Sequence, residues 1–265
     1  MFIKEIIFEK DYKKIINNEN IIKKYNNDIL NSKLLIIKNI FNKKKILDLK
    51  KYLIEIGRNS LPGYYPVKLG SPNHHRIINN DHRSIVKGKF HQFSFFRWNQ
   101  DIHDVFKIFQ KGYWIKNLLT GIKKNTYLNQ AKTKKESEVV ARVSIQFYPS
   151  GMGYMNEHSD PVGFHQVSAP LVIMSEKGKD KDFETGGSFI YFKNRKNKIY
   201  VEDLADIGDL VLYDSSLPHG VDLIDKGKKN DWINFRGRWT AVLASNKVQG
   251  SHVFKDAIDI QRGGI

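Results

Sequence analysis

The sequence has no cysteine among its 265 residues. Disulfides, zinc–thiolate sites, iron–sulfur clusters and cysteine nucleophiles are therefore excluded. Long apolar runs are missing as well, because no run approaches the roughly 18 residues that a membrane-spanning helix needs. The N-terminus alternates charged and apolar residues and lacks the apolar stretch of a signal peptide. We therefore expect a soluble, cytoplasmic protein with no membrane partner.

Acidic residues are scarce beside basic ones, with 28 Asp and Glu against 44 Lys and Arg and a formal net charge of +16. Such an excess favours an anionic partner, such as nucleic acid or a phosphorylated metabolite. However, Lys is spread with Asn and Ile along the whole chain, and no stripe combines basic residues with stacking aromatics. Compositional bias is therefore the preferred explanation, and nucleic acid is not the expected partner.

The N-terminal half shows patterns typical of alternating strands and helices. Leu34–Phe41 is apolar and β-branched, as in a short buried strand. Asn42 is a suitable N-cap for a following amphipathic helix, and Gly57 lies where its C-cap is expected. Asp101–Gly121 also has a helical period. These patterns predict an α/β support for the rest of the chain.

Between these two helical segments, residues 58–90 are rich in Pro and Gly and predict a loop, whereas His91–Trp98 is aromatic and strand-like.

The C-terminal half has the sequence pattern of an all-β fold. From Val139 onward, short apolar runs alternate with Gly, Pro and Asp turns, as in a β-sandwich or barrel. We expect a mostly-β protein, with residues 1–138 as the supporting region and 139–265 as a jelly-roll core, folded as one unit.

A candidate metal site lies in this second half. His158 and Asp160 form an H-x-D element, and side chains at i and i+2 of an extended backbone point to the same face. Glu157 would point the other way. His219, beyond a later buried strand, offers a third ligand. Two His and one carboxylate on one face of a metal are typical of non-haem Fe(II) oxygenases, which leave positions open for a co-substrate and O₂.

The segments around these residues resemble a known superfamily as an ordered set. The matching pieces are FYPSGMGYMNEHSD, the Gly-Gly pair in ETGGSFIYF, GDLVLY, LPHGV and GRWTAVL, within residues 139–245. They are similar to the double-stranded β-helix (cupin-like jelly-roll) core of the 2-oxoglutarate/Fe(II)-dependent oxygenases, closest to the prolyl-4-hydroxylase-like branch. The resemblance implies Fe(II), 2-oxoglutarate and O₂ as cofactor and co-substrates, with ascorbate as an assay additive.

The resemblance also implies a site for 2-oxoglutarate. The family carries an Arg on the strand after the distal His, and Arg suits a buried carboxylate because its planar fork matches the two oxygens. Arg238 holds that place, and Arg236 is the alternative if the strand register differs. Tyr148 corresponds to a Tyr that hydrogen-bonds the co-substrate in this branch, and Thr240 could add a hydroxyl to the same carboxylate.

The substrate is less defined. Asn156, Phe164, His165 and Gln166 flank the metal ligands and are candidates to face it. The resemblance implies hydroxylation of an unactivated C–H of a small molecule, with release of succinate and CO₂, and the basic composition favours an anionic one. The alternatives are a non-catalytic cupin-like metal- or ligand-binding protein and an AlkB-like nucleic-acid demethylase. That last branch has a second Arg several residues beyond the first, which is missing here. The sequence does not indicate an oligomeric state.

Overall fold

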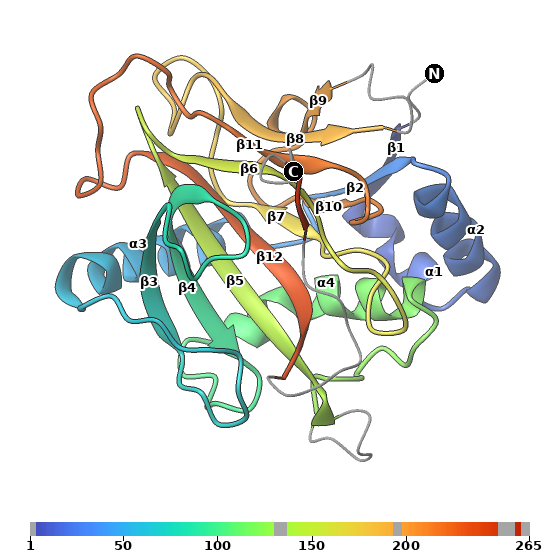
Figure 1. Ribbon diagram of the computed structural model, residues 1–265. Coiled ribbons are helices and arrows are strands. Elements are labelled where there is room, and N and C mark those ends of the chain that lie inside the picture. The colour runs from blue at the N-terminus through green and yellow to red at the C-terminus, as the bar shows by residue number, and fades with distance from the viewer. Residues whose placement is uncertain (1–3, 130–136, 193–197, 249–257, 261–265) are drawn as a thin grey trace.

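The computed structural model describes residues 4–129, 137–192, 198–248 and 258–260. Most of the strands in these ranges follow one another in a rolled sheet, in the order β1-β2-β10-β7-β12-β5-β4-β6-β11-β8-β9, and β3 pairs with β4 and β13 with β6 (Figure 1). The strands are β1 (Lys4–Phe8), β2 (Leu34–Lys38), β3 (His74–Asn79), β4 (Gly88–Phe96), β5 (Val139–Pro149), β6 (Tyr154–Ser159), β7 (Leu171–Ile173), β8 (Gly187–Tyr191), β9 (Lys198–Tyr200), β10 (Leu210–Leu212), β11 (His219–Asp222), β12 (Gly237–Lys247) and β13 (Ile258–Asp259).

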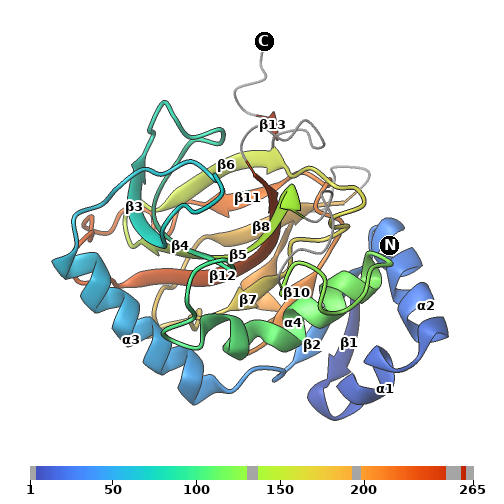
Figure 2. The same ribbon diagram turned by 90° about the horizontal axis from the view of Figure 1, so that it is seen from below.

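The helices cover one side of the rolled sheet, as Figure 2 shows. The described helices are α1 (Tyr12–Ile16), α2 (Glu19–Leu30), α3 (Lys43–Asn59) and α4 (Val105–Leu119), with short 3-10 turns η1 (Glu9–Asp11) and η2 (Val201–Asp203). None of these helices is both long and apolar enough to cross a membrane. The helices pack against the outside of the sheet.

The two long central strands, β5 and β12, have one apolar and one polar face. Phe147 of β5 and Trp239 of β12 are buried in the same core cluster as Phe109 of α4. The alternate side chains, such as those of Gln146 and Thr240, face a cavity on the other side. Because side chains of a strand alternate between its faces, the apolar half anchors the helices and the polar half becomes available for a site.

Several local expectations are confirmed, and two are wrong. The Asn42 side chain accepts a hydrogen bond from the Lys45 amide at 3.1 Å and caps α3, as predicted. Gly57, however, does not end this helix, which continues to Asn59. A Cβ at Gly57 would lie 2.4 Å from the Phe235 ring, so packing explains this glycine. The predicted loop 58–90 contains β3, which forms by pairing with the distant β4.

Both halves of the sequence contribute to the same sheet. Among the strands before residue 139, β2 pairs with β10, and β4 lies between β5 and β6. The residues expected to support the core therefore supply part of its wall. The observed architecture is the mostly-β, double-stranded β-helix type expected from the sequence, with helices on its outer side.

Candidate metal centre and cavity

The three predicted metal ligands converge at one point of the sheet. His158 on β6 is directly paired with His219 on the antiparallel neighbour β11. Asp160 follows the end of β6, where its amide donates to the Ser215 carbonyl at 2.9 Å. One ligand atom from each of the three residues can be chosen so that all lie within 4.8 Å of one another. Strand pairing thus brings together residues that are far apart in the sequence.

The hydrogen bonds of both imidazoles select the nitrogen that can bind a metal. The Nδ1 atom of His158 lies 2.8 Å from the Asn156 carbonyl oxygen, and Nδ1 of His219 lies 2.8 Å from that of Leu217. A carbonyl oxygen only accepts, so each Nδ1 must donate its hydrogen. The Nε2 atoms are then the ligand nitrogens, in the orientation that metal-binding histidines commonly have.

The carboxylate of Asp160 completes the donor set in its ionised form. Burial opposes ionisation, but at low pH the protonated His219 and His158, together with Arg142, hold the pKa of Asp160 at about 2, so the carboxylate is already ionised at neutral pH. Its Oδ2 lies 3.6 Å from Nε2 of His219. Two neutral imidazoles and one carboxylate fit an octahedral Fe(II) that keeps three positions for other ligands.

The metal ligands open into a cavity of about 420 Å³. Its walls are the polar faces of β5 and β12 on one side and residues of β6, β8 and β11 on the other. Arg238, Tyr148 and Thr240 all line this cavity. Arg236 precedes β12 and is exposed to solvent. The strand register therefore places Arg238, and not Arg236, in the same space as the metal ligands.

Arg238 is fully buried and only partly paired. Its Nε donates to Oε1 of Glu202, and its Nη2 donates to Oγ of Ser188. Its Nη1 atom is buried and has no hydrogen-bond partner among the described residues. An unpaired nitrogen of a buried guanidinium is costly unless an anion binds it. This donor fits the distal carboxylate of 2-oxoglutarate.

Tyr148 and Thr240 lie on either side of this arginine. Tyr148 is directly opposite Arg238 across the β5–β12 pair, and its ring centroid is 5.2 Å from the guanidinium carbon. Its hydroxyl donates to Oε1 of Gln146 at 2.7 Å, and burial raises the pKa of Tyr148. The Thr240 hydroxyl donates to the Val172 carbonyl at 3.0 Å. Both hydroxyl oxygens can still accept a hydrogen bond, but both hydroxyl protons are already donated to other groups.

Glu202 is a residue of this site that the sequence analysis missed. It lies in η2 and its Oε2 accepts from the Ser188 amide at 2.8 Å, while Oε1 binds Arg238. The Gly-Gly pair in the sequence reflects this contact. A Cβ at Gly187, whose φ is +123°, would lie 2.7 Å from Oε2 of Glu202. The pair was visible in the sequence, but the carboxylate that requires it comes from a different segment.

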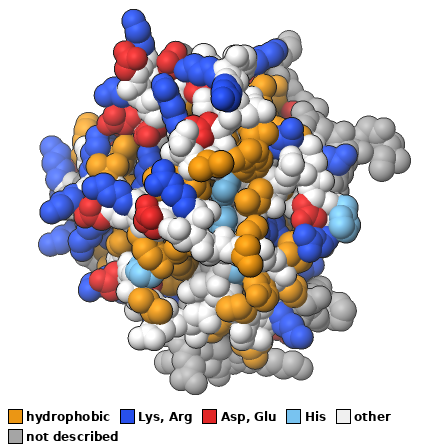
Figure 3. All heavy atoms as spheres, turned by 90° about the vertical axis from the view of Figure 1, so that its left-hand side faces the viewer, with side chains coloured by type: hydrophobic (Ala, Val, Ile, Leu, Met, Phe, Trp, Pro, Cys, Tyr) orange, Lys and Arg blue, Asp and Glu red, His pale blue; other side chains and the backbone are white. Residues whose placement is uncertain are grey.

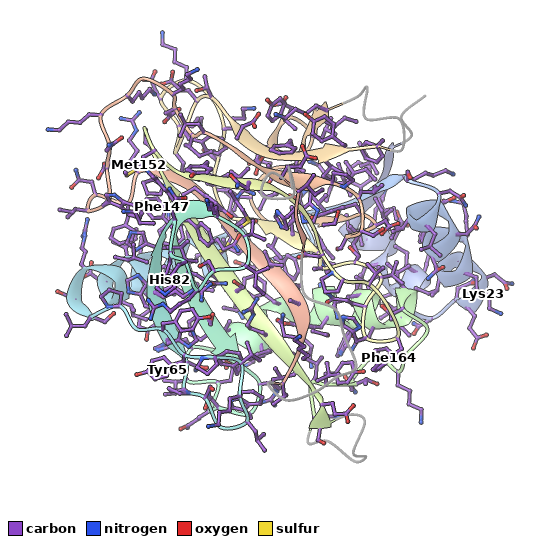
Figure 4. The ribbon with its side chains drawn as sticks, in the orientation of Figure 1. Lys23, Tyr65, His82, Phe147, Met152 and Phe164 are labelled. Carbon is purple, nitrogen blue, oxygen red and sulfur yellow. The ribbon has the colours of Figure 1, made fainter. Side chains whose placement is uncertain are left out.

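The four expected substrate residues separate into two groups. His165 and Gln166 are buried and line the cavity. Asn156 and Phe164 are not among the described residues of its wall. Figure 4 shows Phe164 on the loop after β6, on the α4 side of the molecule. Of the expected set, only His165 and Gln166 are therefore placed to contact a ligand in this cavity.

A buried lysine behind His165 is expected to make stability depend on pH. Lys116 of α4 donates to Oγ of Ser245 and, at 3.4 Å, to the His165 carbonyl. Burial lowers its pKa from 10.5 to about 7. Above about pH 7 the unfolded state binds one more proton than the folded state, so the free energy of unfolding rises with pH by up to about 1.4 kcal/mol per unit.

Lys116→Met removes this titration. We expect the variant to gain most over the wild type near pH 6, and the gain to shrink steadily between pH 7 and pH 10. Urea unfolding of both proteins at several pH values measures the difference. Lys107→Met, an exposed change on the same helix, is the control and should show no such trend. A gain for Lys116→Met that is constant with pH would contradict the assignment.

Comparison with known proteins identifies the fold of the chain. No protein-family model matches the chain, and no curated protein matches it. Solved structures do match. An oxygenase described as putative, from Shewanella oneidensis, is 9% identical, with 94% of this chain and 91% of that one covered and a TM-score of 0.52. A 2OG-Fe(II) oxygenase family protein from Caulobacter crescentus is 11% identical, with coverages of 94% and 87% and a TM-score of 0.50.

A third match was crystallised with its ligands. JOX2, in complex with 2OG, Fe and JA, is 10% identical, with 94% of this chain and 77% of that one covered and a TM-score of 0.52. The chain therefore has the double-stranded β-helix fold of the 2-oxoglutarate/Fe(II)-dependent oxygenases, as expected from the sequence.

Proposed function

We propose that the protein is an Fe(II)- and 2-oxoglutarate-dependent dioxygenase that hydroxylates an unactivated C–H bond of a small molecule. The observation that carries this proposal is the unpaired Nη1 of Arg238 in the same cavity as the His–Asp–His cluster. A metal-binding jelly roll without enzymatic activity needs the cluster but has no use for a buried, half-paired arginine. The fold of the matched oxygenases supports the same class.

Each part of the site has a role in this reaction. His158, Asp160 and His219 would hold iron from one side, and Arg238 would bind the distal carboxylate of 2-oxoglutarate, with Tyr148 and Thr240 beside it. When bound, iron and 2-oxoglutarate supply the oxidation, in which O₂ is consumed and succinate and CO₂ are released. The walls of β5 and β12 position the substrate and exclude water.

The face of the molecule that Figure 3 shows gives little support to a nucleic-acid substrate. On the face that Figure 3 shows, Lys and Arg side chains are interspersed with acidic ones, and hydrophobic and histidine side chains lie between them. Non-specific nucleic-acid binding depends on a continuous basic footprint. A small-molecule substrate is therefore the proposed one.

The direct test is co-substrate binding followed by turnover. Anaerobic addition of 2-oxoglutarate to the Fe(II)-loaded protein should produce the charge-transfer absorption band of an iron–keto-acid complex. Admission of O₂ with a pool of metabolites should then release succinate. A protein that binds iron but never binds 2-oxoglutarate would contradict the proposal and favour the cupin-like binding protein.

Asp160→Ala should stop succinate-coupled hydroxylation while the fold is retained. The carboxylate is the anionic ligand of the cluster, and its loss opens a coordination position that an exogenous anion could fill. Glu157→Gln, one residue before His158, is the matched control and should keep activity. Product formation measured by mass spectrometry checks both variants. If Glu157→Gln were as inactive as Asp160→Ala, the assignment of the carboxylate ligand would be reversed.

A further inference from the structure

A second arginine, which is half-buried and which the site described above does not use, lines the same cavity. Arg142 lies on β5 with its side chain on the cavity face, and its Nε is buried with no hydrogen-bond partner among the described residues. Burial and the charge of Arg76 lower the pKa of Arg142 to about 10, so it stays protonated at neutral pH. A guanidinium nitrogen that is buried without a hydrogen bond is costly unless another group accepts from it.

Arg76 of β3 repeats this arrangement. Its Nε is also buried without a hydrogen-bond partner in the described chain, and its guanidinium carbon lies 4.9 Å from the Tyr64 ring centroid. His74 lines the cavity from the same strand, and burial, followed by the charges of Arg76 and Arg142, lowers the pKa of His74. Arg142, Arg76 and His74 therefore line the same cavity although the two arginines repel each other.

The carboxylates near this group have other partners. Asp81 acts on Arg76, but its Oδ2 and Oδ1 bind Nη2 and Nε of Arg83 at 2.7 and 3.0 Å. Asp160 acts on Arg142, but it belongs to the candidate metal ligands. Within the described part of the chain, both carboxylates thus have other roles, and the charge of the two arginines is available to a ligand.

Arg142 lies toward the end of the cavity away from Arg238, and Arg76 lines the same cavity from β3, where it pairs with Gln92 of β4. Tyr148, the partner of Arg238 across the sheet, is six residues from Arg142 on the same strand. At about 3.3 Å per residue, that is roughly 20 Å along β5. At this end Arg142 is paired with Phe96, the last residue of β4, and Figure 4 shows Tyr65 near the same ends of β3 and β4. Arg142 is therefore well separated along the strand from the arginine proposed to hold 2-oxoglutarate.

We propose that Arg142 and Arg76 bind an oxyanion, a carboxylate or a phosphate, carried by the oxidised substrate. The planar guanidinium fork matches both groups. Asp160 interacts electrostatically with Arg142, and the candidate metal ligands share one cavity with both arginine sites. The substrate would be anchored by its anion at one end and present a C–H bond toward the metal. This inference rests on the proposed function and narrows its substrate to anionic small molecules.

The test uses matched probes that differ only in charge. Benzoate is compared with benzamide, and phenyl phosphate with phenol, by calorimetric titration of the full chain loaded with Mn(II), with and without 2-oxoglutarate. Relaxation of the probe protons by Mn(II) reports whether a bound probe lies near the metal. We expect at least one anion to bind roughly 10- to 100-fold more tightly than its neutral partner, as for a charge-assisted hydrogen bond.

Arg142→Gln and Arg76→Gln should each remove most of this preference and leave 2-oxoglutarate affinity within about twofold. The control is Arg58→Gln, the same charge change at an exposed residue of α3 paired with Glu55, which should keep the preference. The benzoate and phenyl phosphate arms separate a carboxylate from a phosphate.

Three outcomes would overturn the inference. The first is equal binding of anionic and neutral probes, or a preference that survives in both cavity variants. The second is loss of 2-oxoglutarate binding in Arg142→Gln, which would mean that the co-substrate itself occupies the pair. The third is displacement of the probes by a single-stranded oligonucleotide that binds more tightly than they do. Failure of 2-oxoglutarate to bind the wild type would instead refute the proposed function, and the titrations without it would still decide the oxyanion site.

Discussion

Replacing either His158 or His219 by alanine is expected to abolish tight Fe(II) binding. Both rings hold their Nδ1 hydrogens on backbone carbonyls and leave Nε2 as the ligand atom, so the cluster is oriented before a metal arrives. Loss of a residue that only orients a ligand costs roughly 10- to 100-fold in metal affinity, and loss of a ligand itself should cost more. The variants should keep no stoichiometric iron after desalting, as measured by elemental analysis.

The control for the metal experiment is another histidine outside the cluster. His82 has a side chain that is 92% exposed, so His82→Ala should bind one Fe(II) per chain like the wild type. Circular dichroism should show that all three variants are folded. Full metal retention in both His158→Ala and His219→Ala would mean that the iron site lies elsewhere.

The second large effect is expected at Arg238. Removing one partner of a buried charged pair costs about 3–5 kcal/mol, which corresponds to roughly a hundred- to a thousand-fold or more in 2-oxoglutarate affinity. Iron binding should survive, because Arg238 is not a ligand. Arg238→Lys should recover affinity only in part, since an ammonium cannot reproduce the planar fork. Anaerobic titration of the charge-transfer band measures these affinities.

The pairing of Arg238 with Glu202 complicates the alanine variant and also provides its control. Arg238→Ala leaves the buried Glu202 carboxylate without its cation and should destabilise the fold. The double variant Arg238→Ala/Glu202→Gln removes that orphaned charge, so it should recover stability to urea but not 2-oxoglutarate affinity. Arg236→Ala, at an exposed position, should be mild. If Arg236→Ala were the crippling change, the register of β12 would have to be reconsidered.

Local patterns allowed much of this protein to be predicted from its sequence. The H-x-D spacing places His158 and Asp160 on one face of an extended segment whatever the rest of the chain does. The short apolar runs separated by Gly, Pro and Asp turns from Val139 onward similarly indicate a β-rich fold. The Asn42 cap depends on a hydrogen bond three residues away, and such short-range features survive without knowledge of the tertiary fold.

Features that depend on distant segments were not accessible in this way. β3 was missed because an isolated run of mixed residues becomes a strand only when β4 pairs with it. The sequence suggests a helix end at Gly57, because the packing of Gly57 against the Phe235 ring depends on a residue far away in the chain. In both cases the local signal was ambiguous, and the contact that resolves it is between residues far apart in the chain.

The sequence by itself determined which residue types are candidates for the metal site, since His158 and Asp160 are two residues apart and His219 follows a recognisable apolar strand. Only the tertiary structure decided which charged groups are buried and which partners they have. It exposes Arg236 and buries Arg238 against Glu202 and Ser188, and it brings Arg142 and Arg76 together from separate strands. The physical reason is that the state of a buried charge depends on which partners the closed sheet places beside it, and closure is a property of the whole fold.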